Sequence, residues 1–97
     1  MGKDLITSTD QELIQEVRTG NRRAYSELVK RHQKALLRMA LRFVKDLDTA
    51  EDVVQESFIK AYEKLNLFEG RASFKSWLFQ IAVNTAKNKL RENKRIT

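Results

Sequence analysis

The chain has 97 residues, enough for one small domain over residues 1–97, with an expected structured core over residues 8–95. Nineteen basic and 13 acidic residues give a net charge of +6, and 41% of the residues are hydrophobic, which permits a folded core. The absence of cysteine excludes disulfides and thiolate metal sites, while the absence of proline favours long helices. No apolar run reaches the roughly 20 residues of a membrane span, and the amino terminus lacks a signal-peptide core. An all-α, cytoplasmic domain is expected, with no membrane insertion.

The first half of the chain contains residue patterns that are typical of helix starts and ends. Thr9 and Glu12 have the spacing of a capping box, and apolar residues follow at helical intervals. Gly20 suits the end of this helix because glycine accepts a left-handed backbone, and Asn21 can cap the next helix. The apolar stripe of that second helix comprises Tyr25, Leu28, Val29, His32, Leu36, Met39, Ala40 and Phe43.

The second half repeats the same pattern. Asp48 and Glu51 form the next capping signature, residues 66–72 with Gly70 read as a loop, and Ser73 can cap the last helix. The stripe of the third helix is Ala50, Val53, Val54, Phe58, Ala61, Tyr62 and Leu65. Helices are thus predicted over residues of about 10–19, 22–45, 49–65 and 74–93. Four helices with short connections predict a compact four-helix bundle.

Neither a metal site nor a catalytic apparatus is visible. The Asp46-x-Asp48 pair does not continue as a calcium loop, because Ala50 and Glu51 stand where a ligand and a glycine are needed. The single histidine, His32, lies on an apolar stripe and is interpreted as a satisfied core or boundary residue. No cofactor is therefore expected, and the protein is not expected to be an enzyme.

Charge is segregated along the chain. Nine basic residues and one acid, Glu27, occur between Arg18 and Lys45, and helix dipoles leave this long basic stretch unexplained. The outer face of the third helix is instead acidic and carries Ile59 among Asp52, Gln55, Glu56 and Glu63. An acidic rim around an aliphatic residue suits docking on a basic protein, although composition alone favours a solvated face.

The fourth helix presents amides and cations on one ridge: Gln80, Asn84, Lys87, Asn88, Arg91 and Arg95. Amides can bind base edges and cations can bind phosphates, which is the combination that a nucleic-acid reader needs. Upstream, Phe68, Phe74 and Trp77 cluster near Arg71 and Lys75. If exposed, these rings form a stacking platform for single-stranded bases. The alternative is that Phe74 and Trp77 belong to the core, and for Trp77 the two interpretations are equally weighted.

Two motifs carry a family resemblance. Residues 48–58, DTAEDVVQESF, contain the pattern E-D-x-x-Q-E-x-F, and residues 74–84 fit F-x-x-W-L-x-x-I-A-x-N. Their order and spacing resemble region 2 of the extracytoplasmic-function group of bacterial sigma factors. The resemblance extends from Thr9 to Arg95. Such factors normally continue into a second promoter-binding domain, so this chain is expected to be an isolated amino-terminal domain, natural or truncated.

The resemblance implies two interfaces. The family's acidic third helix docks on the clamp helices of the polymerase beta-prime subunit, which implies the polymerase-binding residues Asp48, Asp52, Gln55, Glu56 and Ile59. The family's loop and last helix capture the non-template strand of the promoter minus-ten element, with one base flipped into a pocket near the loop. The implied DNA-binding residues are Phe68, Arg71, Ser73, Phe74, Lys75, Trp77, Gln80, Asn84, Lys87, Asn88, Arg91 and Arg95.

The resemblance also implies an anti-sigma protein that covers these surfaces. The expected function is therefore that of a transcription initiation factor domain. One alternative is a helical single-stranded DNA- or RNA-binding module unrelated to polymerase, which would leave the acidic third-helix face idle. Another is an amphipathic membrane-surface bundle, which is disfavoured because mutual packing accounts for the apolar stripes.

Overall fold

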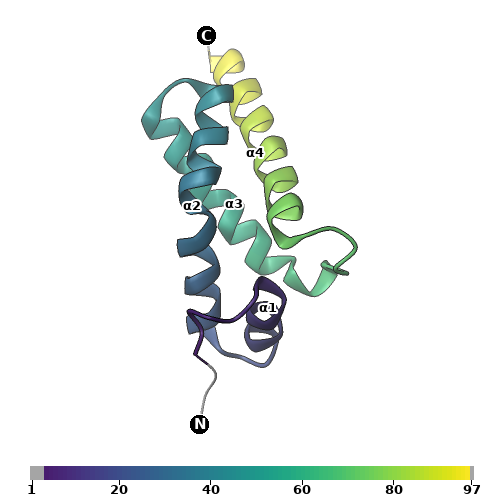
Figure 1. Cartoon of the computed structure of the whole chain (residues 1–97). Coiled ribbons are helices and arrows are strands. Elements are labelled where there is room, and N and C mark those ends of the chain that lie inside the picture. Colours follow the sequence, from purple (N-terminus) through teal and green to yellow (C-terminus); the bar gives the residue numbers. More distant parts are fainter. Residues whose placement is uncertain (1–3, 97) are drawn as a thin grey trace.

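The structure is a computed structural model that describes the backbone of residues 4–96 and the side chains of residues 4–92. Four α-helices and one short 3-10 helix make up the described chain (Figure 1): α1 (Asp10–Arg18), α2 (Arg22–Val44), α3 (Leu47–Glu63), η1 (Leu65–Leu67) and α4 (Phe74–Ile96). The short α1 lies across the base of the bundle, below the longer helices. This arrangement confirms the prediction of a four-helix domain.

The first helix begins and ends, and the second begins, within one residue of the predicted positions. The Thr9 hydroxyl accepts from the Glu12 N–H at 3.1 Å, and the Glu12 carboxylate accepts from the Thr9 N–H at 2.8 Å, which completes the capping box. Gly20 has φ +102°, and the N–H groups of Gly20 and Asn21 donate to Val17 and Glu16 carbonyls. This is a Schellman motif, and glycine supplies its left-handed residue. The Asn21 side chain then caps α2 by accepting from the Arg23 N–H.

The start of α3 differs from the prediction. Its N-cap is Asp46, whose carboxylate accepts from the Thr49 N–H at 2.9 Å, so the predicted cap at Asp48 with Glu51 is wrong. The cause lies in the preceding helix: α2 ends at Val44, and Lys45 turns the chain in a left-handed conformation with φ +59°. Only two residues separate the helices, so α3 begins two residues earlier than predicted. Hydrogen bonds from Thr49 also lower the pKa of the Asp46 carboxyl.

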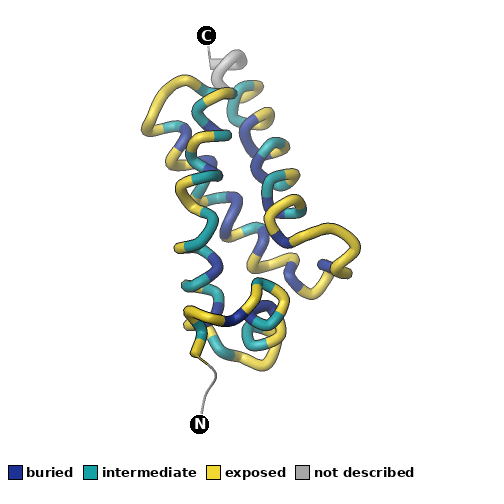
Figure 2. The backbone as a smooth tube through the Cα atoms, viewed as in Figure 1, coloured by how far each residue is buried: buried dark blue, intermediate teal, exposed yellow. Residues whose placement is uncertain are grey.

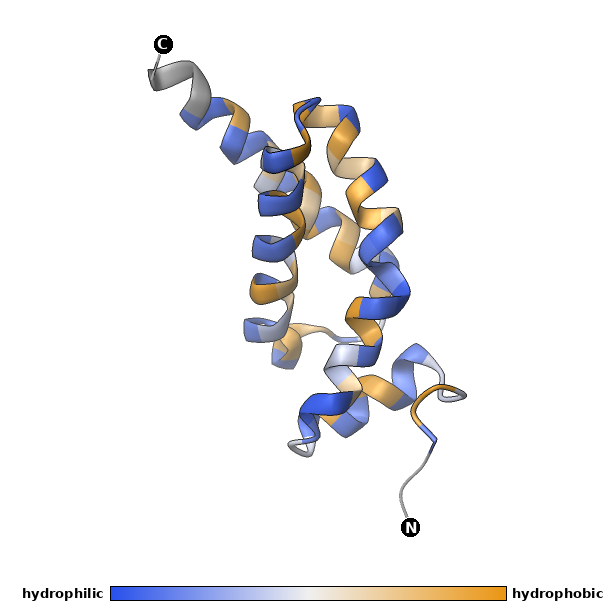
Figure 3. Cartoon of the chain, turned by 90° about the vertical axis from the view of Figure 1, so that its left-hand side faces the viewer, coloured by the Kyte–Doolittle hydropathy of each residue, from blue (hydrophilic) through white to orange (hydrophobic). Residues whose placement is uncertain are grey.

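The core runs along the axis where α2, α3 and α4 pack on one another, and α1 closes its lower end against α2 (Figure 2). Figure 3 shows orange apolar positions between the helices and blue hydrophilic positions outside. The main buried cluster is Leu13, Ile14, Ala24, Leu28, Leu36, Phe58, Ala61, Leu65, Phe68, Phe74, Leu78 and Ala82. A second cluster lies toward the α2–α3 turn and consists of Ala40, Ala50, Val53 and Ala86. Three of its four members are alanines, which lets the helices approach closely.

Two polar side chains inside the bundle are satisfied locally. Ser57 donates to the Val53 carbonyl at 2.6 Å, and Thr85 donates to the Ile81 carbonyl at 2.8 Å. Among the described residues, every buried side-chain nitrogen or oxygen has a hydrogen-bond partner. Within residues 4–96, no helix combines the length and apolar character that a membrane crossing requires.

Tyr62 was predicted to face the core, but 45% of its surface is exposed. Tyr25 occupies the inner position instead, with its ring edge-on to Tyr62 at 5.0 Å and its hydroxyl donating to the Phe58 carbonyl. Burial, with a smaller contribution from Tyr62, raises the pKa of Tyr25 well above its usual value. Tyr25 thus ties α2 to α3.

Candidate nucleic-acid and protein interfaces

The loop before α4 is built around aromatic side chains that point inward. Phe68 and Phe74 are buried, 7% and 3% exposed, so the predicted exposed platform is wrong for these two rings. Phe74 packs edge-on to Phe68 at 6.2 Å and against the His32 ring at 5.7 Å, which explains its burial. Trp77 is half-buried with its centroid 5.0 Å from Phe68, so part of the indole remains at the surface. Of the three rings, only Trp77 can meet a base without rearrangement.

The polar residues of this loop are exposed. The Ser73 hydroxyl accepts from the Ser76 N–H at 3.1 Å, as predicted for the cap of α4. Arg71 lies 3.2 Å from a Glu69 carboxylate oxygen, but both side chains are exposed, so this pair holds the loop only weakly. Lys75 lies 5.6 Å above the Phe79 ring in a cation–π contact. Arg71, Ser73 and Lys75 thus lie together at the amino-terminal end of α4.

The ridge along α4 is exposed as the helical spacing predicts. Gln80, Asn84, Lys87, Asn88 and Arg91 are all at the surface. Arg91 Nη2 donates to Asn88 Oδ1 at 2.8 Å, which leaves the amide NH₂ of Asn88 as its outward donor. Arg95, also predicted for this ridge, lies among the residues whose side chains are outside the described part. One helix face therefore offers amide groups flanked by cations.

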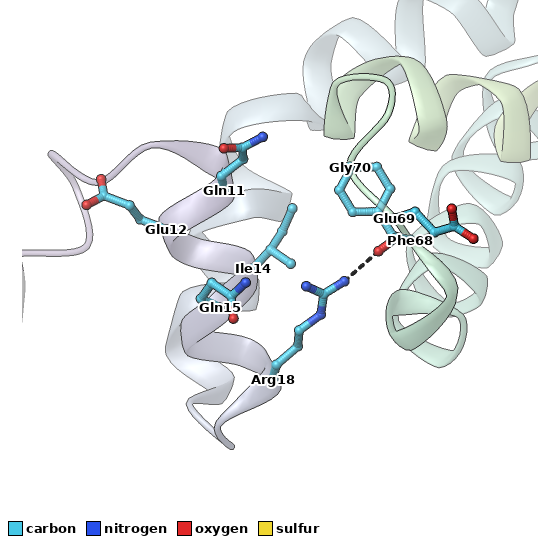
Figure 4. Close-up of a pocket in the computed structure, with 8 residues that line it drawn as sticks. All are labelled: Gln11, Glu12, Ile14, Gln15, Arg18, Phe68, Glu69 and Gly70. Carbon is cyan, nitrogen blue, oxygen red and sulfur yellow. Dashed lines mark hydrogen bonds between the residues drawn. The ribbon is translucent and has the colours of Figure 1, made fainter.

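A groove of about 440 Å³ separates α1 from the loop (Figure 4). Its lining residues are Gln11, Glu12, Ile14, Gln15, Arg18, Phe68, Glu69 and Gly70. Arg18 Nη2 donates to the Phe68 carbonyl at 2.6 Å and to the Leu65 carbonyl at 3.1 Å. Gly70 has φ +80° in the turn that forms the opposite wall. The sequence did not single out the α1 residues of this groove, because nothing in their local pattern indicates a partner some 50 positions away.

The outer face of α3 is largely as predicted. Asp48, Asp52 and Gln55 are exposed, and Ile59 is 60% exposed among them. Glu56 differs, because its carboxylate lies 3.9 Å from Lys60 and 4.0 Å from Lys89. These two cations partly neutralise it.

A second groove, of about 300 Å³, lies between α2 and α3 beside this acidic face. Leu37 and Val54 are its apolar members, and the polar members are Gln33, Lys34, Glu51 and Gln55. Gln55 thus borders both the outer face of α3 and this groove. An aliphatic side chain of a partner would meet apolar surface here with polar groups around it.

The only histidine acts as a boundary residue, as interpreted from the sequence. His32 Nε2 lies 2.8 Å from Asp10 Oδ2, which links α2 to α1. Arg31 strengthens the same junction by binding Asp10 and the carbonyls of Leu5 and Ile6. Across the described residues, no group of three or more potential metal ligands comes together.

Comparison with known proteins identifies the family of this chain. The chain matches the family described as Sigma-70 region 2 over residues 28–96, and it belongs to that family. Within it, the chain is a region 2 domain of the extracytoplasmic-function (ECF) group, which confirms the resemblance carried by the two motifs. Sigma factor domains act by binding, so the chain is not an enzyme.

Several curated relatives are close in sequence. The chain is 46% identical over 86 residues to RNA polymerase sigma-H factor of Pseudomonas aeruginosa, covering 89% of this chain and 45% of that protein. It is 48% identical over 82 residues to the ECF RNA polymerase sigma-E factor of Escherichia coli, covering 84% and 42%. The chain therefore spans less than half the length of these relatives.

Two solved structures are similar to this one. An engineered region 2 of sigmaE, solved by NMR in complex with GTAAAA, has a TM-score of 0.85 and 42% identity, covering 98% of this chain and 96% of that one. CnrH in complex with the cytosolic domain of CnrY has a TM-score of 0.75 and 35% identity, covering 81% and 51%. The first of these similarities confirms the all-helical fold class.

Proposed function

We propose that this domain captures the single-stranded non-template strand of a promoter minus-ten element during transcription initiation in the cytoplasm. The observation that carries the proposal is the exposed amide–cation ridge of α4, together with the likeness to a sigmaE region 2 bound to GTAAAA. Amide groups of Asn84 and Asn88 would bind base edges, which report sequence. Lys87, Arg91 and Arg95 would bind phosphates, which position the strand.

Capture needs no chemical step. Bases that unpair transiently are held by the protein, so the melted state gains population in proportion to its stronger binding. The half-buried Trp77 is the ring available for stacking, with Phe68 and Phe74 supporting it from the core. Arg71, Ser73 and Lys75 would hold the strand as it passes the loop. The groove beside Gly70 would accept a flipped base, because the amide side chains of Gln11 and Gln15 line it and can bind base edges.

We further propose that the outer face of α3 docks on the clamp helices of the polymerase beta-prime subunit. Ile59 supplies an apolar contact, while Asp48, Asp52 and Glu56 supply the acidic surroundings and Gln55 a hydrogen-bonding group. An anti-sigma protein is the proposed antagonist, by analogy with CnrH and the cytosolic domain of CnrY. A single-strand-binding module without polymerase would leave this α3 face without a role.

Strand capture is tested by fluorescence anisotropy with labelled oligonucleotides. The expected order of affinity is single-stranded GTAAAA first, a scrambled single strand of the same composition second, and the fully paired duplex last. The logarithm of affinity should fall with the logarithm of salt with a slope of about −0.7 per phosphate neutralised. Equal or tighter binding to the duplex at matched salt contradicts base capture.

Polymerase docking is tested by pull-down with a beta-prime clamp-helix fragment. Replacing Asp52 and Gln55 by lysine should abolish capture, because both side chains are exposed on the proposed face. Glu56 is spared because its replacement would place a third cation beside Lys60 and Lys89.

The matched control for this pull-down replaces Gln80 and Glu92 on α4 by lysine, which makes the same charge change on exposed residues of another helix. If the α3 variant still binds the fragment while circular dichroism shows that it is folded, docking through this face is refuted. Loss of binding in both variants would assign the effect to net charge and would also refute it.

A further inference from the structure

One side chain of α1 donates hydrogen bonds to the start of the loop of residues 68–73. The guanidinium of Arg18, the last residue of α1, donates through Nη2 to the Phe68 carbonyl at 2.6 Å (Figure 4). The same nitrogen donates to the Leu65 carbonyl at 3.1 Å. Leu65 belongs to η1 and Phe68 begins the loop, so the two bonds hold the point where helix gives way to loop. Hydrogen bonds from a charged donor are shorter and roughly twice as strong as neutral ones.

Carbonyls at this point need an external donor. The last carbonyls of a helical segment have no partner within the helix, and side chains or water usually satisfy them. The Leu65 carbonyl accepts only a 3.2 Å bond from the Phe68 N–H within its own turn. Arg18 supplies the additional donor, and it does so from a residue that is 47 positions away from Leu65 in the chain.

The same side chain lines two hollows. One is the groove of about 440 Å³ that Phe68 and Gly70 also line. The other is a smaller hollow of about 220 Å³, lined by Val17, Arg18, Tyr62, Leu65 and Asn66. Shortening Arg18 would enlarge the space around both hollows and remove the hydrogen bonds that it donates to the loop.

Phe68 transmits this support to the proposed base-binding surface. Its ring packs against Trp77 at 5.0 Å and against Phe74 at 6.2 Å. A shift of the Phe68 backbone therefore moves the ring on which the indole of Trp77 lies. The ion pair between Arg71 and Glu69 in the loop is exposed and cannot hold this geometry alone.

We propose that Arg18 is a positioning residue that fixes the loop for base discrimination through its hydrogen bonds to the Phe68 and Leu65 carbonyls. This inference rests on the proposed strand capture. Base selectivity would then depend on the α1–loop hydrogen bonds as well as on the residues that face the strand.

The test compares Arg18→Ala and Arg18→Lys with Arg22→Ala. Arg22 is exposed at the start of α2 and has no side-chain hydrogen bond or ion pair among the described residues, so Arg22→Ala removes the same charge from a neighbouring site. Anisotropy measures the ratio of affinities for single-stranded GTAAAA and its scrambled counterpart at several salt concentrations. Residues that couple sites indirectly change such ratios by a factor of about 2 to 30, and Arg18→Ala should lower the ratio within that range.

The Arg18→Lys variant separates charge from geometry. It keeps the charge, so its salt slope should match that of the wild type, but it lacks the planar fork and should lose part of the selectivity. Arg22→Ala should keep the full ratio. An equal loss of affinity for both strands in Arg18→Ala, with a shallower salt slope, would make Arg18 a phosphate contact and overturn the proposal.

A second readout does not depend on DNA. Amide hydrogen exchange over residues 65–72 should accelerate in Arg18→Ala and stay unchanged in Arg22→Ala, because local opening exposes the loop amides. Unchanged exchange in Arg18→Ala overturns the positioning role even if DNA binding is altered. If the wild type shows no preference between the strands, strand capture is refuted, and with it base selectivity through Arg18. If the wild type is selective and Arg18→Ala keeps the same ratio of affinities for GTAAAA and its scrambled counterpart, only the positioning role of Arg18 is refuted.

Discussion

Phe74 provides the sharpest test of the packing beneath the loop. Its side chain is 3% exposed and is enclosed by His32, Phe68 and Trp77, with ring centroids 5.7 to 6.2 Å away. Replacing a buried phenylalanine with alanine typically lowers the free energy of unfolding by about 3–5 kcal/mol. In a domain of this size each kcal/mol lowers Tm by about 4–8 °C, so Phe74→Ala should lower Tm by about 12–40 °C. The change removes a large part of the usual total stability of about 5–15 kcal/mol.

The control for this prediction is Leu67→Ala, seven residues upstream. Leu67 is 73% exposed, so its truncation should change the free energy of unfolding by less than about 0.5 kcal/mol. Urea denaturation followed by circular dichroism gives both values, and an unchanged m-value certifies that the comparison concerns stability. If Phe74→Ala and Leu67→Ala were equally mild, Phe74 would not be a core residue, and the exposed platform predicted from the sequence would return.

Four further predictions concern three separate parts of the molecule. Tyr25→Phe should lower the free energy of unfolding by about 0.5–1.5 kcal/mol at neutral pH. Because burial raises the folded-state pKa of Tyr25, the stability of the wild type should fall above pH about 10 and approach that of the variant. Urea titrations at pH 7 and 11 measure both effects. Thr9→Ala should cost about 1 kcal/mol through loss of the α1 cap, whereas Thr9→Ser should cost little in the same titration. Asn84→Ala should weaken anisotropy-measured binding to GTAAAA by about 1–3 kcal/mol and to scrambled strands much less. Arg91→Ala should weaken both and also reduce selectivity, because it frees the Asn88 carbonyl oxygen; equal losses for both strands in Asn84→Ala would contradict base reading.

Local chemistry made most of the fold predictable. The capping box at Thr9, the left-handed Gly20 and the hydroxyl of Ser73 each act within three residues of themselves, so the sequence contains all the required partners. The beginning of α3 was mispredicted because Asp46 and Asp48 are both acceptable caps. The choice between them depends on where α2 ends. The residue that ends α2 in a left-handed conformation is Lys45, and because it is not a glycine the sequence does not indicate this turn.

The candidate interfaces were predictable only in part. Exposure of Gln80, Asn84 and Asn88 follows from a regular helix with one buried face, and helical spacing alone indicates it. The burial of Phe74 agrees with the alternative that this ring belongs to the core. The burial of Phe68 does not follow from spacing, because a loop aromatic faces inward only when other elements offer it a surface. Here α4 supplies that surface through Phe74 and Trp77.

The conformation of the loop depends on a residue from a distant part of the chain. The family match begins at residue 28, so α1 and Arg18 lie outside it, although Arg18 holds the loop that lies well inside it. The proposed DNA contacts within residues 68–88 all lie inside the family match. They can therefore stay identical while the α1 residue that holds the loop differs from one family member to another. If strand capture is correct, two domains with the same base-facing residues but different residues at the end of α1 should differ in selectivity. Exchanging α1 between this domain and a relative, with the loop and α4 held constant, would then transfer part of the selectivity, because the hydrogen bonds that place Phe68 come from α1.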